Sequence, residues 1–485
     1  MSLRNPIRIG VTADEVPSRP TREYTEGMPL TEKCAVFGVH GRGLEAARLV
    51  HTGLWTLQHR GQESSGISVA DGTGITTHKG MGLVAHVYDE AILDRLVGHI
   101  AVGHNRYSTS GGSHTDHSQP VTGGANLVVL AHNGNLPSIT RLVAHLDGER
   151  VDVAGCNDSE LMHRAIEHAM RGGASVETAV RDRFDLFTGV FSMLLMTRDK
   201  LVAVRDRHGI RPLSIGAVDG GFVVSSETCA IDAVRGKFLR DVHPGEMVVI
   251  DHEGLHSTQI VEGREKLDIF EFVYFARPDS ILMGRVVNDV RQDLGAHLAM
   301  EHRVPADVVI PVPDSGVPAA VGYSRQSGIP LDFGLLKNRY IHRTFIRPAQ
   351  HLRESGVRLK LNPIPGVLRD KRVAVIDDSI VRGTTARQIV DLIRAAGAKE
   401  VHFLVSSPPV RFPDFYGIDT PRRGDLIAAQ MSIDEIRAFI RADSLGYLSY
   451  EAMISATRLP EDSFSTSSFT GVYPVDLGEK AALVA

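Results

Sequence analysis

Two adjacent aspartates, Asp377 and Asp378, stand at the end of an apolar run in the stretch VAVIDDSIVRGTTARQIV. In an open parallel sheet, ligands bind beyond the carboxyl ends of the strands. A turn that enters a helix points backbone N–H groups outward, and the helix dipole adds partial positive charge, so such a turn can hold a phosphate. The turn and the start of the predicted helix supply further polar groups: Ser379, Arg382, Gly383, Thr384 and Thr385.

The acid pair indicates what this phosphate is attached to. Two carboxylates can accept hydrogen bonds from ribose hydroxyls, or they can hold Mg²⁺ directly or through water. A phosphate beside a vicinal diol describes a ribose 5-phosphate. Asp377 and Asp378 could instead simply cap the helix, but strand, acid pair, turn and helix follow one another in the order that a binding site requires.

A lone cysteine, Cys34, precedes a short apolar run in TEKCAVFGVHG. A thiol attacks an amide as its thiolate, and because a free cysteine has a pKa of roughly 8.5, it needs a base. If Cys34 were the first residue of the mature chain, its own α-amine, with a pKa of roughly 7.7–8.0, could take the thiol proton and later return it. We therefore expect residues 1–33 to be a leader that is removed; a disordered tail is the alternative.

Three motifs in the first half could bind and polarise a substrate amide. Arg106, in GHNRYSTSG, could hold a carboxylate through two hydrogen bonds, and Asp158, in NDSE, could hold an α-ammonium group. The Asn133 side chain and the Gly134 N–H, in HNGN, could form an oxyanion hole. Together with a nucleophile, these groups describe glutamine hydrolysis.

A basic segment precedes the phosphate motif. Residues 337–360 carry seven lysines and arginines against one glutamate. A highly charged leaving group needs cations, so we expect this segment to act as a mobile lid over pyrophosphate; a solvated or nucleic-acid-binding loop is the alternative. The stretch VPDSG, residues 312–316, is predicted to end another strand in a small-residue turn.

Length and composition limit the class of protein. The chain has 485 residues, which indicates two or three domains, and a net charge of −5, which gives no global field for nucleic acid or an anionic membrane. Three cysteines cannot form a disulfide framework, which is typical of a reducing cytosol. We find no apolar stretch near the roughly 20 residues needed to span a bilayer.

The elements that must position these residues differ between the two halves. The first half reads as short strands with a few helices: strands at 35–40, 66–70, 100–107, 127–132, 190–197, 201–206, 222–227 and 246–251, and helices at 44–59, 158–170 and 175–187. A polar stretch at 251–268 indicates a boundary. Strands and helices then alternate, which predicts a parallel α/β sheet: helices at 285–302, 317–327 and 384–397, and strands at 307–312, 372–377 and 401–406. Ser432 and Glu435 have capping-box spacing.

Two families share these motifs. The stretch VIDDSIVRGTT resembles the phosphoribosyl pyrophosphate (PRPP) signature of type I phosphoribosyltransferases, and the motifs around Cys34 resemble the N-terminal nucleophile domain of class II glutamine amidotransferases. A fusion of the two resembles the glutamine phosphoribosylpyrophosphate amidotransferases, which make 5-phosphoribosylamine, glutamate and pyrophosphate from PRPP, glutamine and water in the first committed step of purine synthesis. FEFVYFARPDS, GLLKNRYIHRTFI and SSPPVRFPDFYGID extend the resemblance to about Pro474.

The resemblance implies an organisation and partners. It implies a leader at 1–33, an αββα N-terminal nucleophile hydrolase sandwich at 34–265, and a phosphoribosyltransferase domain with a parallel sheet and C-terminal helices at 266–485. It further implies Mg²⁺, internal transfer of ammonia, feedback inhibition by purine nucleotides, a cytoplasmic homotetramer, and no nucleic-acid or membrane partner.

The resemblance also implies roles for individual residues. The implied catalytic residues are Cys34, Asn133 and Gly134, and the implied glutamine-binding residues are Arg60, Gly61, Arg106 and Asp158. The implied PRPP-binding residues are Ser315, Lys337, Arg339, Tyr340, Arg343, Asp377, Asp378, Ser379, Arg382, Gly383, Thr384 and Thr385. Among them, Ser315, Asp377 and Asp378 are the implied metal ligands.

One departure from the family concerns a metal cluster. Some relatives with cleaved leaders hold an iron–sulfur cluster through four cysteines, and the matching positions here are Asp268, Asp414, Ser465 and Ser468. Cluster iron is normally held by four thiolates, so we expect no iron–sulfur cluster in this chain. Smaller departures are Ala35, Asn105 and Asn157.

Two other functions remain open at this stage. The first is a PRPP- or nucleotide-binding regulator whose glutaminase has lapsed, which would retain residues 1–33. The second is another class II amidotransferase, such as a sugar-phosphate or asparagine-forming enzyme, which would share the first half but not the DDSIVRGTT motif.

Overall fold

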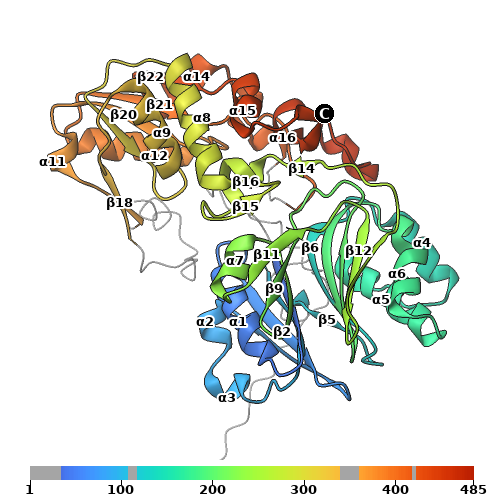
Figure 1. Cartoon of the computed structure of the whole chain (residues 1–485). Coiled ribbons are helices and arrows are strands. Elements are labelled where there is room, and N and C mark those ends of the chain that lie inside the picture. The colour runs from blue at the N-terminus through green and yellow to red at the C-terminus, as the bar shows by residue number, and fades with distance from the viewer. Residues whose placement is uncertain (1–33, 107–116, 339–359, 418–421, 485) are drawn as a thin grey trace, which may run out of the picture.

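The computed structural model describes residues 34–106, 117–338, 360–417 and 422–484. The predicted leader, residues 1–33, lies outside these ranges. The described chain forms two bodies, one built on two antiparallel sheets and one on a parallel sheet (Figure 1). Of the helices in these ranges, none is both long and apolar enough to cross a bilayer.

The first body is a sandwich of two antiparallel sheets. The strands of one sheet are β1 (Cys34–His40), β2 (Ser64–Ala70), β3 (Ile75–Met81), β4 (Ile100–Arg106), β9 (Ser214–Val218), β10 (Gly221–Ser225) and β11 (Lys237–Asp241), in the order β11-β9-β10-β1-β4-β2-β3. Those of the other are β5 (Val121–Thr122), β6 (Val129–Asn135), β7 (Val190–Met196), β8 (Leu201–Arg205), β12 (Glu246–Asp251) and β13 (Gly254–Gln259), in the order β13-β12-β8-β7-β6-β5.

Helices cover the outer faces of this sandwich. α1 (Ala46–Thr56) and α7 (Thr228–Ala233) pack on the first sheet, and α4 (Thr140–Gly148), α5 (Asp158–Arg171) and α6 (Val176–Arg183) pack on the second. A third apolar cluster, which includes Val36, Val102 and Ala131, fills the space between the sheets. The predicted αββα sandwich is therefore confirmed, and β1, β2 and β4 are buried along their whole length because a helix lies on one side and a sheet on the other.

The structure contains strands that the sequence patterns did not predict. β3, β11 and β13 have mostly half-buried or exposed residues, so they lack the apolar alternation that marks a half-buried strand. β13 lies inside the polar stretch 251–268, where we expected a domain boundary, and pairs with β12 as a hairpin. The stretch is polar because β13 is an edge strand, whose side chains are largely exposed. The chain enters the second body after β13, where β14 (Leu267–Asp268) pairs with β23 (Phe464–Ser465).

The second body contains the predicted parallel sheet. Its strands are β17 (Val308–Pro311), β20 (Arg372–Asp377), β21 (Glu400–Val405) and β22 (Ser444–Tyr447), paired in that order. α8 (Val287–Glu301), α9 (Val317–Ser327) and α15 (Tyr450–Thr457) pack on one face, and α12 (Thr384–Ala395) and α14 (Ile433–Ile440) pack on the other. The capping box at Ser432 and Glu435 is present at the start of α14.

Shorter elements complete the two bodies. In the first body they are α2 (Val84–Val87), α3 (Glu90–Leu93) and a 3₁₀ turn at Phe184–Leu186. In the second they are a π-helical turn (Glu271–Phe275), β15 (Ile281–Leu282), β16 (Arg285–Val286), β18 (Leu335–Lys337), β19 (Leu361–Pro363), α11 (Pro365–Leu368), α13 (Ile427–Gln430), α16 (Ser467–Thr470) and 3₁₀ turns at Arg423–Asp425, Glu461–Ser463 and Gly478–Leu483. β18 and β19 form a hairpin that brings the two ends of the basic segment together.

Candidate active sites at Cys34 and at the Asp377–Asp378 pair

The first candidate site begins at the first described residue. Cys34 opens β1, and its side chain is buried. In the antiparallel register, Cys34 lies opposite Arg106 of β4, and Arg106 lies opposite Ser64 of β2 on its other side. The structure thus brings the predicted nucleophile and the predicted carboxylate-binding arginine to the same end of neighbouring strands.

The predicted oxyanion hole lies on the facing sheet. Side chains alternate along a strand, so Cys34 shares the face of Val36, and Asn133 shares the face of Ala131; both apolar residues belong to the cluster between the sheets. The Nδ2 atom of Asn133 is buried and has no hydrogen-bond partner among the described residues. A buried donor left unsatisfied is costly, which fits an amide that serves a developing oxyanion.

Gly134 cannot be replaced by a larger residue without distortion. Its φ angle is +150°, and a Cβ atom there would lie 2.0 Å from the carbonyl oxygen of Val190. The glycine therefore lets β6 approach β7 closely at the residue whose N–H is the second predicted oxyanion donor.

Asp158 is tied to the same strand. It is the first residue of α5, and its Oδ2 accepts a hydrogen bond of 3.1 Å from the N–H of Leu136, which directly follows β6. Asn157 caps the helix through a capping box with Glu160, so the unusual Asn157 has a local structural role. The helix start and the oxyanion strand are therefore held together, as an ammonium site and an oxyanion site for one small substrate must be.

A buried polar cluster supports this corner and was not predicted. The Gln119 side chain accepts from the N–H of His132 at 2.7 Å and donates to Ser159 Oγ at 3.0 Å, and His132 Nδ1 lies 3.1 Å from the same hydroxyl. These bonds join β6 to the first turn of α5. The polar stretch HTDHSQP held no motif from which the contact could be inferred.

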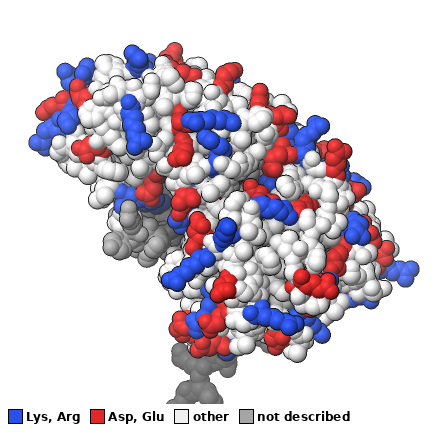
Figure 2. Space-filling view, in the orientation of Figure 1, with Lys and Arg blue, Asp and Glu red and all other residues white. Residues whose placement is uncertain are grey.

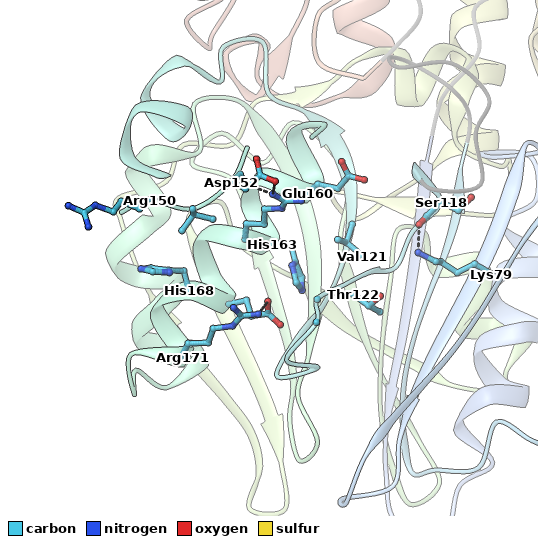
Figure 3. Close-up of a pocket in the computed structure, with 15 residues that line it drawn as sticks. Lys79, Ser118, Val121, Thr122, Arg150, Asp152, Glu160, His163, His168 and Arg171 are labelled. Atoms are coloured by element: carbon cyan, nitrogen blue, oxygen red, sulfur yellow. Dashed lines mark hydrogen bonds and ion pairs between the residues drawn. The ribbon is translucent and has the colours of Figure 1, made fainter. Parts of the chain in front are cut away.

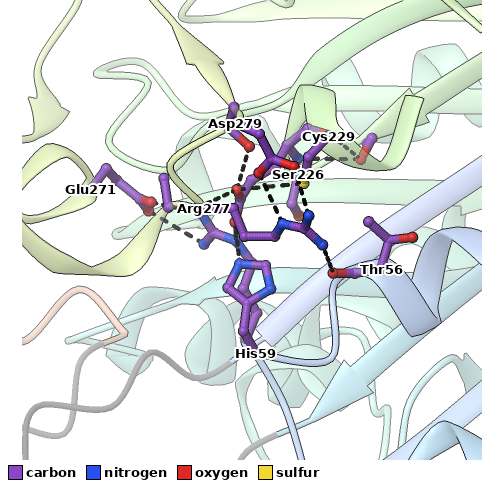
Figure 4. Close-up of polar contacts among 12 residues, drawn as sticks. Thr56, His59, Ser226, Cys229, Glu271, Arg277 and Asp279 are labelled. Atoms are coloured by element: carbon purple, nitrogen blue, oxygen red, sulfur yellow. Dashed lines mark hydrogen bonds and ion pairs between the residues drawn. The ribbon is translucent and has the colours of Figure 1, made fainter. Parts of the chain in front are cut away.

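Arg60 and Gly61, both predicted to bind glutamine, have different surroundings. The Arg60 side chain is fully buried, and its guanidinium pairs with the carboxylates of Glu227 and Glu271 at the junction of the two bodies (Figure 4). Gly61 packs against the backbone of β4: a Cβ atom there would lie 2.7 Å from the carbonyl oxygen of Asn105 and 2.9 Å from the N–H nitrogen of Arg106.

The second candidate site lies at the carboxyl ends of two neighbouring strands. β17 and β20 pair with Pro311 opposite Ile376, so the VPDSG turn and the acid pair emerge side by side. Ser379 Oγ donates to Asp378 Oδ1 at 2.7 Å, and a hydrogen bond from the Ser315 side chain lowers the pKa of Asp378 against the effect of burial. Ser315, a predicted metal ligand, therefore lies within hydrogen-bond distance of Asp378.

The acid pair is suited to a divalent cation. Burial, reinforced by the charge of Asp378, raises the pKa of Asp377 well above its usual range, and burial also raises the pKa of Asp378. Two buried carboxylates without a compensating charge favour protonation, and a hard cation removes that penalty. Asp377, Asp378 and Ser315 offer the oxygen ligands that Mg²⁺ prefers, so these residues fit the ion.

The turn after the acid pair has the features of a phosphate site. Gly383 adopts a φ of +76° directly before α12, and Thr384 Oγ1 is buried without a hydrogen-bond partner among the described residues. Arg382 and Thr385 also lie at this turn. Lys337 instead forms an ion pair of 2.7 Å with Asp314, and Arg339, Tyr340 and Arg343 fall outside the described residues.

The four positions that match the cluster cysteines of some relatives are all buried. Asp268 lies opposite Ser465 in the β14–β23 pair, and Arg211 lies 3.4 Å from Asp268 and 4.0 Å from Asp414. Ser468 accepts backbone hydrogen bonds of 3.0 and 3.1 Å from residues 411 and 412. Carboxylates and hydroxyls around an arginine do not fit an iron–sulfur cluster, which needs thiolates.

A cavity of about 540 Å³ lies along α5 (Figure 3). Its lining includes Lys79, Glu160, His163 and Glu167, but none of the predicted glutamine-site residues.

On the face shown in Figure 2, basic and acidic side chains are interspersed over both bodies.

Comparison with known proteins gives the same two halves. The family of glutamine amidotransferase domains matches residues 104–233, and the family of phosphoribosyl transferase domains matches residues 292–407. An amidophosphoribosyltransferase of Mycobacterium bovis is 44% identical, with 93% of this chain and 88% of the relative covered. That of Bacillus subtilis is 42% identical, with 94% and 96% covered.

Solved structures agree. The B. subtilis glutamine PRPP amidotransferase complexed with ADP and GMP is 42% identical, with a TM-score of 0.85, and the match covers 92% of this chain and 98% of that one. A structure described as the allosteric regulatory enzyme of purine biosynthesis is also 42% identical, with a TM-score of 0.87 over 93% of this chain and 99% of that one.

Proposed function

This chain belongs to the amidophosphoribosyltransferase family, and we propose that its two sites divide that reaction, with glutamine hydrolysed at Cys34 and the ribosyl group transferred at Asp377 and Asp378. The enzyme makes 5-phosphoribosylamine, glutamate and pyrophosphate from PRPP, glutamine and water, the first committed step of purine biosynthesis. The assignment of residues to steps and the removal of residues 1–33 are the parts we propose.

At the first site, Cys34 acts as nucleophile and its own α-amine as base. The amine takes the thiol proton, the sulfur attacks the amide carbon of glutamine, and the oxyanion is held by Asn133 Nδ2 and the Gly134 N–H. The ammonium form returns the proton to the departing nitrogen, which leaves as ammonia. Water then releases glutamate from the thioester. Arg106 and Asp158 bind the α-carboxylate and α-ammonium groups, which supports glutamine as the substrate.

At the second site, the turn 379–385 holds the 5-phosphate and the acid pair binds the ribose hydroxyls. Ammonia from the first site attacks C1′, and the C1′–O bond electrons leave with pyrophosphate. Mg²⁺ held by Asp377, Asp378 and Ser315 would neutralise charge on the leaving group. The Thr384 hydroxyl, buried without a partner in the described chain, supports the phosphate assignment.

We further propose that purine nucleotides regulate the enzyme. The B. subtilis relative was solved with ADP and GMP, and both contain the phosphate that the second site is built to hold. A homotetramer in the cytoplasm remains part of the proposal.

The function is supported above all by one arrangement: Cys34 lies opposite Arg106 in the strand register, and the Asn133 Nδ2 on the facing sheet has no hydrogen-bond partner among the described residues. The decisive measurement is the intact mass of enzyme that is active with glutamine. We expect a chain that begins at Cys34. A chain that is fully active with glutamine while residues 1–33 remain attached would refute the α-amine mechanism, and an uncleaved chain inert with glutamine would favour the regulator.

A further inference from the structure

Three buried side chains connect the groups that bind the two ends of the glutamine molecule. Gln119 precedes β5, His132 lies on β6, and Ser159 lies in the first turn of α5, directly after Asp158. All three side chains are buried. The chemical steps proposed above give none of them a part, and their hydrogen bonds show what they hold in place.

Gln119 takes the place of a strand partner where β5 ends. β5 pairs with β6 at Val129 and Leu130 and extends no further along β6. Beyond that point, Oε1 of Gln119 accepts a hydrogen bond of 2.7 Å from the N–H of His132. A buried backbone N–H needs an acceptor, and here a side chain supplies the acceptor that a strand carbonyl would otherwise provide.

The same amide group reaches the helix. Because Oε1 of Gln119 faces the His132 N–H, Nε2 faces the other way and donates to Ser159 Oγ at 3.0 Å. An amide side chain accepts at one atom and donates at the other, which a carboxylate cannot do. Ser159 in turn lies against Asp158, whose Oδ1 accepts from the Ser159 N–H at 2.8 Å and lies 3.4 Å from Ser159 Oγ.

The carboxylate of Asp158 is therefore held on both sides. Oδ1 is bonded to Ser159, and Oδ2 accepts from the N–H of Leu136, directly after β6, at 3.1 Å. Both neighbours are tied to β6, Leu136 through the chain itself and Ser159 through Gln119. Asp158 cannot shift relative to β6 without breaking one of these bonds.

The peptide group of His132 is held from the opposite sheet as well. Its carbonyl oxygen lies 3.1 Å from Nε2 of His104 on β4. Burial lowers the pKa of His104 to about 3, so the ring carries one proton, and that proton lies on Nε2 because a carbonyl only accepts. His104 lies two residues before Arg106 and shares its face of β4. The strand that leads into Asn133 is thus fixed between the carboxylate-binding and the ammonium-binding groups.

We propose that Gln119 is a positioning residue that fixes the distance from Asp158 to the oxyanion donors and thereby makes the site select glutamine over asparagine. The inference rests on the proposed function. Asparagine is one methylene shorter, so when its ammonium group lies on Asp158 its amide carbon stops short of Cys34. A misplacement of about 1 Å costs roughly 10²-fold in rate. A fixed separation turns the missing methylene into such a misplacement, whereas a loose one adapts to either amide.

The test is Q119M, which keeps the length of the side chain and removes both of its hydrogen bonds. Release of glutamate from glutamine and of aspartate from asparagine is measured in the mature enzyme, together with synthesis from added ammonia. For the parent we expect kcat/KM to favour glutamine by roughly 10- to 200-fold, the usual effect of one methylene.

In Q119M we expect this preference to fall about tenfold or more, because kcat/KM drops for glutamine but changes by less than about threefold for asparagine. Synthesis from added ammonia should stay at the parent level, because the second body is untouched.

A second variant, S159A, breaks the same path at its other end. It removes the hydroxyl that accepts from Gln119 and leaves the bond between Gln119 and His132 in place, so it should also lower the preference for glutamine. Because both changes remove one shared hydrogen bond, the double variant should lose no more of the preference than Q119M alone. S159A also serves as the test if Q119M does not fold.

The matched control is S118A. Ser118 is adjacent to Gln119 and is also buried, but its hydroxyl donates to Met81 Sδ at 3.8 Å rather than to His132 or Ser159. It should keep the preference of the parent for glutamine.

Three outcomes would overturn the inference. The first is a parent that uses glutamine and asparagine equally well. The second is that Q119M and S159A keep the parent preference, or lower kcat/KM for both amides by the same factor, which would indicate a structural role only. The third is a double variant whose loss is the product of the two single losses, which would mean that the residues act separately. A parent inert with glutamine would instead refute the proposed function and, with it, this inference.

Discussion

At the scale of single residues, the side-chain nitrogen of Asn133 is buried and has no hydrogen-bond partner in the described chain. We expect Asn133→Ala to lower glutamine-dependent kcat by roughly 10²–10³-fold, the usual cost of losing one oxyanion donor. Steady-state assays with glutamine and with ammonia check this. Ammonia-dependent synthesis serves as the control and should be unchanged; an equal loss in both assays would contradict the role.

Cys34 gives a sharper separation of the two half-reactions. In Cys34→Ser we expect glutamine-dependent synthesis to be lost, because the hydroxyl is a poorer nucleophile, while synthesis with added ammonia persists, because the acid pair is untouched. The comparison is made at equal enzyme concentration after the intact mass has been recorded. Loss of both activities would mean that Cys34 supports the fold as well as the reaction.

At the scale of elements, the turn between β20 and α12 carries the second site. The pKa values of Asp377 and Asp378 are raised, so the folded protein retains protons that the unfolded chain releases. Their contribution to stability is therefore present at low pH and is lost as the pH rises through the raised pKa values. Because Mg²⁺ binds the deprotonated pair, it should restore stability at high pH.

This predicts a pH-dependent effect of Mg²⁺ with PRPP on the Tm. The increase in Tm should be larger near pH 8 than near pH 5.5, as measured by thermal unfolding with and without the ligands, because protons compete with the cation. The variant in which Asp377 and Asp378 are both replaced by Asn should lose synthesis and most of this increase. Two results would argue against the metal site: an increase in Tm that is equal at both pH values, or an increase in the double variant that equals that of the parent.

At the scale of the whole molecule, the junction between the bodies holds a second set of buried acids. Burial raises the pKa of Asp268 to about 7, with Arg211 opposing and Asp414 reinforcing the shift. The folded protein thus holds a proton that the unfolded chain releases near pH 4, so the free energy of unfolding should fall as the pH rises from about 4 to about 7.

Asp268→Asn should flatten that fall, because the amide does not titrate. Denaturant unfolding at several pH values between about 4 and 7 gives the slope of the unfolding free energy against pH. Asp279→Asn, at an exposed position, is the matched control and should keep the slope of the parent. A slope in Asp268→Asn as steep as in the parent would assign the pH dependence to other groups.

Residues that act within one short segment could be predicted from the sequence. The acid pair, the turn and the start of α12 are contiguous, and the capping box at Ser432 depends on residues three apart, so local backbone chemistry determines them. The parallel sheet of the second body followed from hydrophobic periodicity and the order of elements, whereas the αββα sandwich was implied by the family resemblance.

Contacts between distant segments were decided only by the tertiary structure. The sequence contained Arg60, but its partners Glu227 and Glu271 lie 167 and 211 residues away, and their selection depends on how the two bodies pack. The same holds for the hydrogen bonds of Gln119 and for the polar edge strand β13. The backbone of β13 pairs with β12, although the sequence of β13 has no apolar pattern that would predict a strand. Local preferences act over a few residues, whereas a buried charge is stable only where the whole fold supplies its partner.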